Sequence, residues 1–235
     1  MFAFLSRLDG VAFTDAVGPG GSVLSLPGRP ASASPGWIAV QAEIGLPIAV
    51  VKQVHSAVVL PVDAGTDLET LAATQADALV TTIRGLALAV RVADCVPVLL
   101  TDAVAGMAGA AHAGRVGLAA GVIEATVAAM RGLGAAKITA WIGPHICGDC
   151  YEVPEAMRAE VAARLPQTWA TTSWGTPALD LGRGAQAILE GFGCQVHQVG
   201  SCTNTTPTLH SYRRDAHDSG RQAGIVWLPA PIETP

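Results

Sequence analysis

The chain has 235 residues, of which 50% are hydrophobic and 14% are charged, with a formal net charge of −5. This composition is typical of a globular protein with a sizeable core, and the lack of a basic run argues against a nucleic-acid-binding surface. We also expect neither a membrane span nor a signal peptide, because no apolar stretch reaches about 18–20 residues and the N-terminus lacks a basic region before an apolar run.

The first half of the chain predicts a loop, a helix and several short strands. Residues 18–35 are rich in Gly, Pro and Ser, which indicates a loop, and a helix is expected over 35–44. Short apolar runs with many β-branched residues then predict strands. These runs cover residues 48–54, 78–82, 86–92, 96–101 and 107–111.

The second half predicts helices alternating with strands. Apolar residues at helical spacing, followed by Gly132, predict one continuous helix over 116–132. Further helices are expected over 154–165, with Pro in the first turn, and over 181–192. Strands are expected over residues 137–142, 194–199 and 224–228. The order predicts an α/β (α+β) fold, a single domain over 1–235 in which a mixed β-sheet is layered with helices.

Three side chains that can bind metal follow apolar strands. His55 and Cys95 come after such segments, and His112 lies at the end of a third. Ligand sites of open α/β sheets lie beyond strand ends, so the side chains of Cys95 and His112 would meet if their preceding strands pair in parallel. Two histidines and a cysteine are a plausible zinc set with one open position, and they can also hold copper.

The spacing of these three residues matches no local metal motif, so other interpretations stay open. Cys95 fits a small buried thiol and His112 a histidine bonded to a carbonyl. Cys95 as nucleophile with His112 as base would instead make a cysteine hydrolase. The C-x-x-C pair Cys147 and Cys150 is a poor zinc signal by itself. The 5 scattered cysteines favour reduced thiols and a cytoplasmic location.

Arginines supply candidate anion-binding groups. Arg115 follows His112 at the expected start of a helix, where glycines and free backbone N–H groups could admit phosphate. Nearer the C-terminus, HSYRRD and the following GR place three arginines close together, and their forked donors suit phosphate or carboxylate. The alternative is a solvated loop with an Arg–Asp pair. The candidate substrate-binding residues are Arg115, Ser211, Tyr212, Arg213 and Arg214.

Several motifs in order along the chain carry a family resemblance. They are KQVHS at 52–56, ADALVT at 76–81, ADCVPVLLTD at 93–102, AAHAG at 110–114, IGPHICGDCYEV at 142–153, HSYRRD at 210–215 and GRQAGIVWL at 220–228. This series resembles the laccase-domain family, also described as YfiH-like proteins, multicopper polyphenol oxidases or purine nucleoside phosphorylases.

The resemblance implies a YfiH-like α/β domain in which His55, Cys95 and His112 hold zinc and form the catalytic centre. It also implies phosphorolysis of adenosine, inosine, guanosine and S-methyl-5′-thioadenosine, with deamination of adenosine. Purine nucleoside and phosphate would then be the partners, in a pocket lined by Ser211–Arg214. Copper-type polyphenol oxidase activity is an alternative, disfavoured because the chain has only 6 histidines.

The chain departs from the family pattern at two places. The family's Thr-Thr-Arg-x-Gly-Gly stretch reads TDAVG at 14–18, without arginine, and its His-Ala-Gly-Trp-Arg-Gly reads HAGRVG at 112–117. We hypothesise that Arg115, helped by Arg213 or Arg214, supplies the missing charge. A metal-binding partner protein without catalysis is the alternative that the lost arginine suggests.

Overall fold

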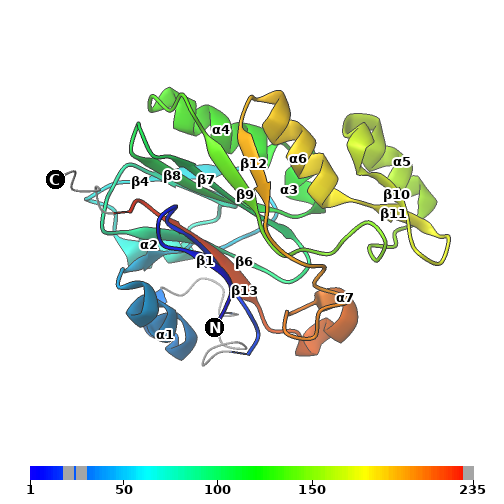
Figure 1. The fold of residues 1–235 in the computed structure, drawn as a ribbon, viewed down its shortest axis with the longest axis horizontal. Coiled ribbons are helices and arrows are strands. Elements are labelled where there is room, and N and C mark those ends of the chain that lie inside the picture. Colours follow the sequence, from blue (N-terminus) through cyan, green and yellow to red (C-terminus); the bar gives the residue numbers. More distant parts are fainter. Residues whose placement is uncertain (18–23, 25–30, 230–235) are drawn as a thin grey trace.

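The computed structural model describes residues 1–17, 24 and 31–229 (Figure 1), so most of the loop expected over 18–35 lies outside the described residues. Two sheets form its centre. The five-stranded sheet runs in the order β1 (Phe2–Ser6), β2 (Val11–Thr14), β13 (Gln222–Trp227), β6 (Ala87–Val92), β3 (Ile48–Ala49). The six-stranded sheet runs in the order β12 (Gln195–Gln198), β9 (Thr139–Ile142), β7 (Val96–Asp102), β8 (Met107–Ala113), β5 (Ala78–Thr81), β4 (Val59–Val62).

Helices and a small hairpin complete the described chain. The helices are α1 (Pro35–Ile44), α2 (Leu68–Ala73), α3 (Arg115–Ala119), α4 (Val122–Gly132), α5 (Glu155–Arg164), α6 (Leu181–Gly191) and α7 (Tyr212–Asp215). The hairpin pairs β10 (Trp169–Thr171) with β11 (Pro177–Leu179). Among the described helices, none combines the length and the hydropathy that a membrane crossing requires.

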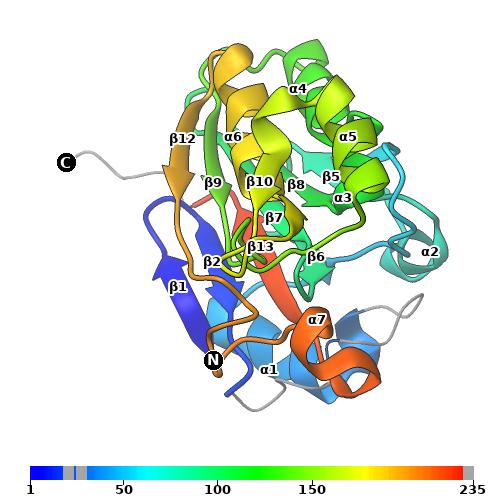
Figure 2. The same ribbon diagram turned by 90° about the vertical axis from the view of Figure 1, so that its right-hand side faces the viewer.

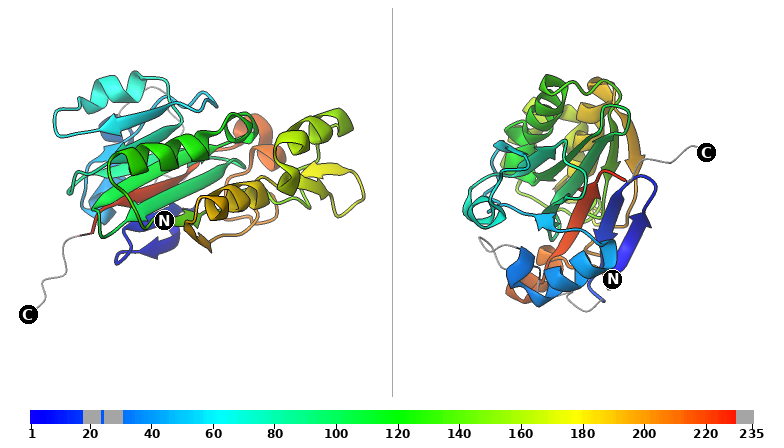
Figure 3. Two further views of the ribbon diagram at one scale, coloured as in Figure 1. Left: turned by 90° about the horizontal axis from the view of Figure 1, so that it is seen from above. Right: turned by 90° about the vertical axis from the view of Figure 1, so that its left-hand side faces the viewer.

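The two sheets pack face to face, and helices cover their outer faces (Figures 1 and 2). One apolar cluster fills the space between the sheets and includes Leu88 of β6 and Leu99 of β7. A second lies between the six-stranded sheet and α4 and α6, which lie over it (Figure 3). A third lies between the five-stranded sheet and α1. The prediction of a single mixed α/β domain is confirmed, with two sheets in place of the one expected.

The central strands β7 and β8 are buried along their whole length. Helices cover one face of their sheet and the second sheet covers the other, so these strands have no solvent face. Their sequences are apolar except at Thr101, Asp102 and His112. Small residues of β8 let α4 approach closely. A Cβ at Gly109 would lie 3.0 Å from the sulfur of Met130. The core therefore fixes the ends of β7 and β8 rigidly, which matters because the candidate site lies there.

Two predicted elements differ from the structure. The helix expected over 116–132 is broken into α3 and α4, because Gly121 between them takes a left-handed φ of 91°. The strand expected over 48–54 ends at Ala49. Beyond it, the side chain of Gln53 replaces the strand pairing, since its amide donates to the carbonyl of Arg91 and accepts from the Arg91 N–H, both at 2.8 Å.

A buried carboxylate holds two turns at the far end of β7. Asp102 is 1% exposed, and its oxygens accept hydrogen bonds from the backbone N–H groups of Val104, Ala105, Ala136 and Lys137. Burial alone raises the pKa of Asp102, but these donors outweigh it and lower the pKa below its ordinary value. The ionised form thus stabilises the fold above the ordinary pKa of aspartate, and this contribution is lost as the pH falls.

Asp102→Asn should therefore destabilise the protein. An amide can accept from one pair of N–H groups, but its own NH₂ then faces the other pair. We expect the free energy of unfolding to fall by about 1.5–3 kcal/mol at neutral pH. The difference should shrink at roughly pH 3, below the ordinary pKa of aspartate, because the contribution of the ionised carboxylate is being lost there. Urea denaturation of both proteins at both pH values measures the two free energies of unfolding. A difference between wild type and variant that is as large in acid as at neutral pH would contradict the prediction.

Candidate functional site

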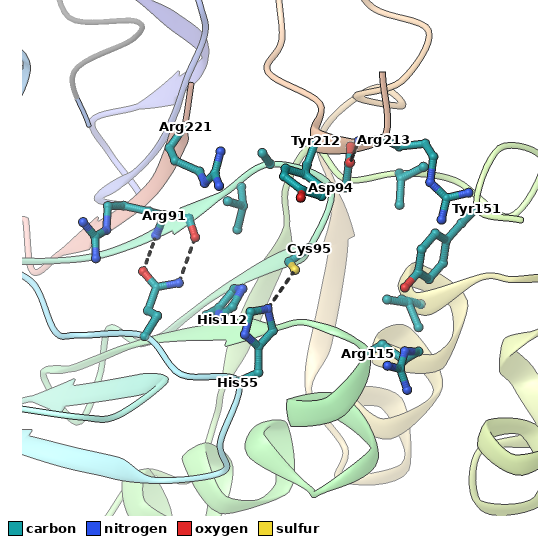
Figure 4. A pocket seen from close by; sticks show the side chains of 15 residues that line it. His55, Arg91, Asp94, Cys95, His112, Arg115, Tyr151, Tyr212, Arg213 and Arg221 are labelled. Atoms are coloured by element: carbon teal, nitrogen blue, oxygen red, sulfur yellow. Dashed lines mark hydrogen bonds between the residues drawn. The ribbon is translucent and has the colours of Figure 1, made fainter. Parts of the chain in front are cut away.

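His55, Cys95 and His112 converge at one end of the two sheets (Figure 4). Their ligand atoms all lie within 4.8 Å of one another. The sulfur of Cys95 is 3.8 Å from Nε2 of His55, and the two imidazole rings meet edge to face with centroids 4.8 Å apart. His112 is buried, Cys95 is partly buried and His55 is exposed. The structure thus brings together the three side chains that the sequence singled out.

The strands assemble this group differently from the predicted parallel pairing. The strand before Cys95 is β6, which belongs to the five-stranded sheet, whereas His112 lies on β8 of the other sheet. Cys95 lies in the short turn from β6 to β7. Because β7 and β8 are antiparallel, with Pro97 opposite His112, the start of β7 lies beside the end of β8. The parallel pairing occurs instead between β3 and β6, the strands that precede His55 and Cys95.

Asp77 organises two of the three residues from behind. It is fully buried at the head of β5, and its Oδ1 accepts from Nδ1 of His112 at 2.7 Å and from the backbone N–H of His55 at 2.9 Å. Its Oδ2 accepts from the N–H and hydroxyl of Ser56. These bonds hold His55 in a left-handed conformation, φ 62°, that costs a non-glycine residue about 1–2 kcal/mol. With Nδ1 bonded to Asp77, Nε2 of His112 is left for a metal.

The turn that carries Cys95 is held by its neighbour Asp94. Asp94 has a φ of 84°, and its carboxylate accepts from the hydroxyl of Thr203 and the backbone N–H of Arg213, both at 2.6 Å. Its backbone carbonyl accepts from Ile146 at 3.0 Å. Asp94 therefore ties the Cys95 turn to two loops and to α7. Gly114 completes the packing, since a Cβ there would lie 2.6 Å from the ring of His55.

Charge in the group favours a cysteine thiolate. Burial raises the pKa of Cys95, but the charge of His112 and hydrogen bonds from both histidines outweigh it and lower the pKa to about 6. Burial lowers the pKa of His112, but Cys95 and Asp77 outweigh it and raise the pKa to about 9. The thiolate is the form of cysteine that binds metal ions. Two imidazoles, one thiolate and a carboxylate behind one histidine fit a bound metal ion.

A cavity of about 600 Å³ opens beside this group. That volume suits a small-molecule ligand. Three of the predicted substrate-binding residues, Arg115, Tyr212 and Arg213, line it. Arg213 lies over the ring of Tyr151 at 5.1 Å, and its Nη1 donates to the carbonyl of Glu152 at 2.9 Å.

Ser211 and Arg214 do not line the cavity. Ser211 is fully buried, and its hydroxyl accepts from the N–H of Arg214 at the start of α7. The guanidinium of Arg214 pairs with Asp215 and donates to backbone carbonyls of the preceding loop. These two residues therefore shape the loop beside the cavity.

Sequence reasoning missed the arginine that is buried deepest in the cavity wall. Arg91 on β6 is 8% exposed and donates to the carbonyl of Val51. Burial, and then the positive charge of Arg221, lower the pKa of Arg91 to about 10. Arg91 and Arg221 both lie at one side of the cavity (Figure 4). Arg115 and Tyr151 lie on the opposite side, with the His55–Cys95–His112 group between them (Figure 4).

Asp77→Asn should weaken metal binding without removing a ligand. The asparagine amide places its own N–H donors where the carboxylate oxygens accepted hydrogen bonds from His112, His55 and Ser56. The orientations of His112 and His55 are then no longer fixed. Loss of such a supporting partner lowers metal affinity by about 10–100-fold. Competition with a chromogenic chelator measures this affinity. Asp63→Asn, in an exposed turn, is the matched control. Unchanged affinity in Asp77→Asn would contradict the supporting role.

Comparisons with known proteins identify relatives of this chain. The family model described as multi-copper polyphenol oxidoreductase laccase matches residues 34–229. A Streptomyces griseus protein named purine nucleoside phosphorylase ORF3 is 55% identical over 181 residues, which cover 75% of this chain and 72% of that protein. A Mycobacterium tuberculosis protein, also named purine nucleoside phosphorylase, is 43% identical over 205 residues, 85% of this chain and 80% of its own length.

Solved structures agree with these matches. The crystal structure of Neisseria meningitidis protein NMB0706 is 31% identical, with a TM-score of 0.77, and the match covers 98% of this chain and 99% of that one. The crystal structure of Bacillus licheniformis hypothetical protein YfiH is 25% identical, with a TM-score of 0.79, and covers 93% and 92% of the two chains. The fold described above is therefore shared over nearly the whole chain.

Proposed function

This chain belongs to the multi-copper polyphenol oxidoreductase laccase family, and from that premise we propose that it is a zinc-dependent purine nucleoside phosphorylase. One observation carries the proposal. A metal-type group and the arginines Arg91 and Arg221 line the same cavity, which has room for a nucleoside and phosphate. Two relatives that are 55% and 56% identical are named purine nucleoside phosphorylases, which supports the same activity.

Zinc fits the donor set better than a copper cluster. His55, Cys95 and His112 would hold one Zn²⁺, which supplies a Lewis acid beside the substrate. A multicopper oxidase centre needs several more histidines. Of the 6 in the chain, only His55 and His112 are among the residues that line the cavity. The role of Asp77 is to hold His112 with Nε2 toward this centre, as its 2.7 Å bond to Nδ1 indicates.

We place the phosphate at Arg91 and Arg221. Both guanidinium groups lie at one side of the cavity, and their forked donors suit phosphate oxygens. The backbone of Arg91 is fixed by the side chain of Gln53, which also lines the cavity. The anion site would therefore be largely preformed.

This placement changes the interpretation of the missing N-terminal arginine. The segment that departs from the family pattern begins at Thr14 on β2, whose hydroxyl accepts from the N–H of Ala223 on β13. Thr14 thus lies beside Ala223, which follows Arg221 by two residues. Arg115 lies on the opposite side of the cavity (Figure 4). Arg91 and Arg221 are better placed than Arg115 to provide the lost charge.

The opposite wall would hold the nucleoside. Phosphorolysis joins a phosphate oxygen to C1′ of the ribose and breaks the bond from C1′ to N9 of the purine, so the departing purine must gain a proton. Burial raises the pKa of Tyr151, although the charges of Arg115 and Arg213 oppose this, so its hydroxyl keeps its proton at neutral pH. Tyr151 and Arg115 would therefore be hydrogen-bond donors to the purine or ribose of adenosine, inosine, guanosine or S-methyl-5′-thioadenosine.

Product analysis on adenosine, with and without phosphate, tests this proposal. Zinc-loaded protein should release adenine and ribose 1-phosphate only when phosphate is present. The same chromatogram detects deamination, which the family resemblance adds as a side activity and which would yield inosine or hypoxanthine. If purine were never released from any of the four nucleosides, the phosphorylase assignment would fail and a metal-binding protein without catalysis would remain.

A cysteine hydrolase is the second candidate, favoured by one observation. Cys95, with its pKa lowered to about 6, lies 3.8 Å from Nε2 of His55, as a nucleophile beside a base would. The two candidates use the same thiol in incompatible ways, because a metal-bound thiolate is a poor nucleophile. Metal-free protein that hydrolyses ester or amide substrates and is inactivated by iodoacetamide would favour the hydrolase.

A further inference from the structure

We propose that Cys147, Cys150 and Cys202 form a second metal site, in which three thiolates bind Zn²⁺. The sulfur atoms of these residues all lie within 4.8 Å of one another. None of them takes part in the His55–Cys95–His112 group, and the structure has no disulfide at any of the five cysteines. The proposal is independent of the phosphorylase assignment.

Two turns from distant parts of the chain bring the thiols together. Cys147 and Cys150 lie in one turn, closed by a hydrogen bond from the N–H of Cys150 to the carbonyl of Cys147 at 3.1 Å. Cys202 begins the second turn, which is closed by a hydrogen bond from the N–H of Thr206 to the carbonyl of Cys202 at 3.1 Å. A short parallel bridge between His145 and Cys202 joins the turns. A C-x-x-C turn facing a further thiol has the ligand spacing of structural zinc sites.

Hydrogen bonds in the cluster prepare one sulfur for a cation. The sulfur of Cys202 accepts the backbone N–H of Cys147 at 3.4 Å. A cation bound between the three sulfurs would stabilise them as thiolates, the form of cysteine that binds metal ions.

A metal accounts for this arrangement better than a disulfide does. A disulfide joins two sulfurs and leaves the third, whereas one thiophilic ion contacts all three. Soft thiolate ligands select zinc or monovalent copper, and zinc accepts water at the fourth position of a tetrahedral site. Cys150 is buried, and Cys147 and Cys202 are partly exposed, so the cluster is reachable by an ion.

The position of the cluster gives the second metal a structural role in the cavity wall. Ile146 and Tyr151, which flank the C-x-x-C turn, both line the cavity. Thr203, next to Cys202, donates to Asp94 beside Cys95. A metal that joins the two turns would therefore fix the wall that carries Tyr151 and the turn that carries Cys95.

The Cys95→Ala variant isolates this site, because it removes a ligand from the first one. After zinc loading and desalting, we expect this variant to keep about one zinc per chain, as a structural three-thiolate site would. Thiol titration of the folded variant should show the cluster thiols protected until a strong chelator is added. Cobalt substitution should give an intense sulfur-to-metal charge-transfer band. Measuring the Cys95→Ala variant alone decides the proposal even if further substitutions prevent folding.

Two double variants assign the ligands. Cys95→Ala combined with Cys147→Ser should lose the remaining zinc and the charge-transfer band. Cys95→Ala combined with Cys194→Ala is the matched control, because Cys194 is buried away from the cluster, and it should keep both. The proposal is overturned if Cys95→Ala binds no zinc, if Cys147→Ser keeps it, or if the purified protein instead contains a disulfide within the cluster.

Discussion

Cys95→Ala and His112→Ala are each expected to abolish zinc binding at the first site and to lower kcat/KM for phosphorolysis by at least about a thousandfold, since metal assistance contributes several kcal/mol. Each variant removes one of only three protein ligands whose donor atoms lie within 4.8 Å of one another. His112→Ala also leaves Asp77 fully buried without the imidazole that it binds at 2.7 Å.

Controls separate loss of the site from loss of the fold. His197→Ala is the matched variant, because His197 is an exposed histidine on β12 that stacks on Trp141 away from the cavity. It should keep zinc and activity. Circular dichroism of every variant checks folding. Of the two ligand variants, Cys95→Ala should destabilise the fold less, because it creates only a small gap. Near-normal turnover by folded Cys95→Ala would contradict the role of this group.

Arg91→Met is expected to raise the KM for phosphate by about 10–100-fold, the effect of losing a charge-assisted hydrogen bond of about 1.5–3 kcal/mol. The KM for the nucleoside should change little, because Arg91 lies with Arg221 on one side of the cavity. Methionine keeps much of the buried volume of the arginine stem. Steady-state kinetics with phosphate and inosine varied in turn measure the two constants.

Arg115→Ala gives the contrasting result. Arg115 lies beside Tyr151 on the opposite wall, so this variant should mainly raise the KM for the nucleoside. Arg7→Met, at an exposed ion pair with Glu43, should change neither constant. If Arg115→Ala raised the phosphate KM and Arg91→Met did not, the phosphate would belong on the Arg115 side, as the sequence alone suggested.

Elements with a strong local signal could be predicted from the sequence. The helix over 35–44 begins at Pro35 and ends before Gly45, which has the left-handed φ of 75° typical of a helix stop. The continuous apolar runs of β7 and β8 predicted buried strands. The three metal-binding residues could be predicted because a polar side chain at the end of an apolar strand requires a hydrogen-bond partner or a ligand.

Elements that depend on tertiary contacts were not predicted. The edge strand β4 contains Pro61, which removes a strand N–H and weakens the signal. The break at Gly121 was missed because the apolar positions continue at helical spacing on both sides of it. The division of the strands between two sheets depends on which strands pair across long loops, and alternation of apolar residues does not encode partners.

Some site residues gave a signal that was too weak by itself. Asp77 is a single carboxylate in an apolar segment of the sequence, and Arg91 is a single arginine in the apolar sequence of β6. Each is a buried charge, and burial of a charge requires a compensating partner. Conversely, Ser211 and Arg214 belong to a polar cluster whose hydrogen bonds turn inward to stabilise α7. The partners of the side chains distinguish these two cases. Asp77 binds His112 of the site, whereas Ser211 and Arg214 bind groups of their own loop, and the sequence alone does not reveal such partners.

The central claim is that zinc at His55, Cys95 and His112 and phosphate at Arg91 and Arg221 together cleave a purine nucleoside. The most direct measurement is release of hypoxanthine from inosine by metal-free protein that is reloaded with zinc, with and without phosphate. The account predicts release only when both zinc and phosphate are present, with ribose 1-phosphate as the second product. Release without phosphate, or none from zinc-loaded protein, would contradict it.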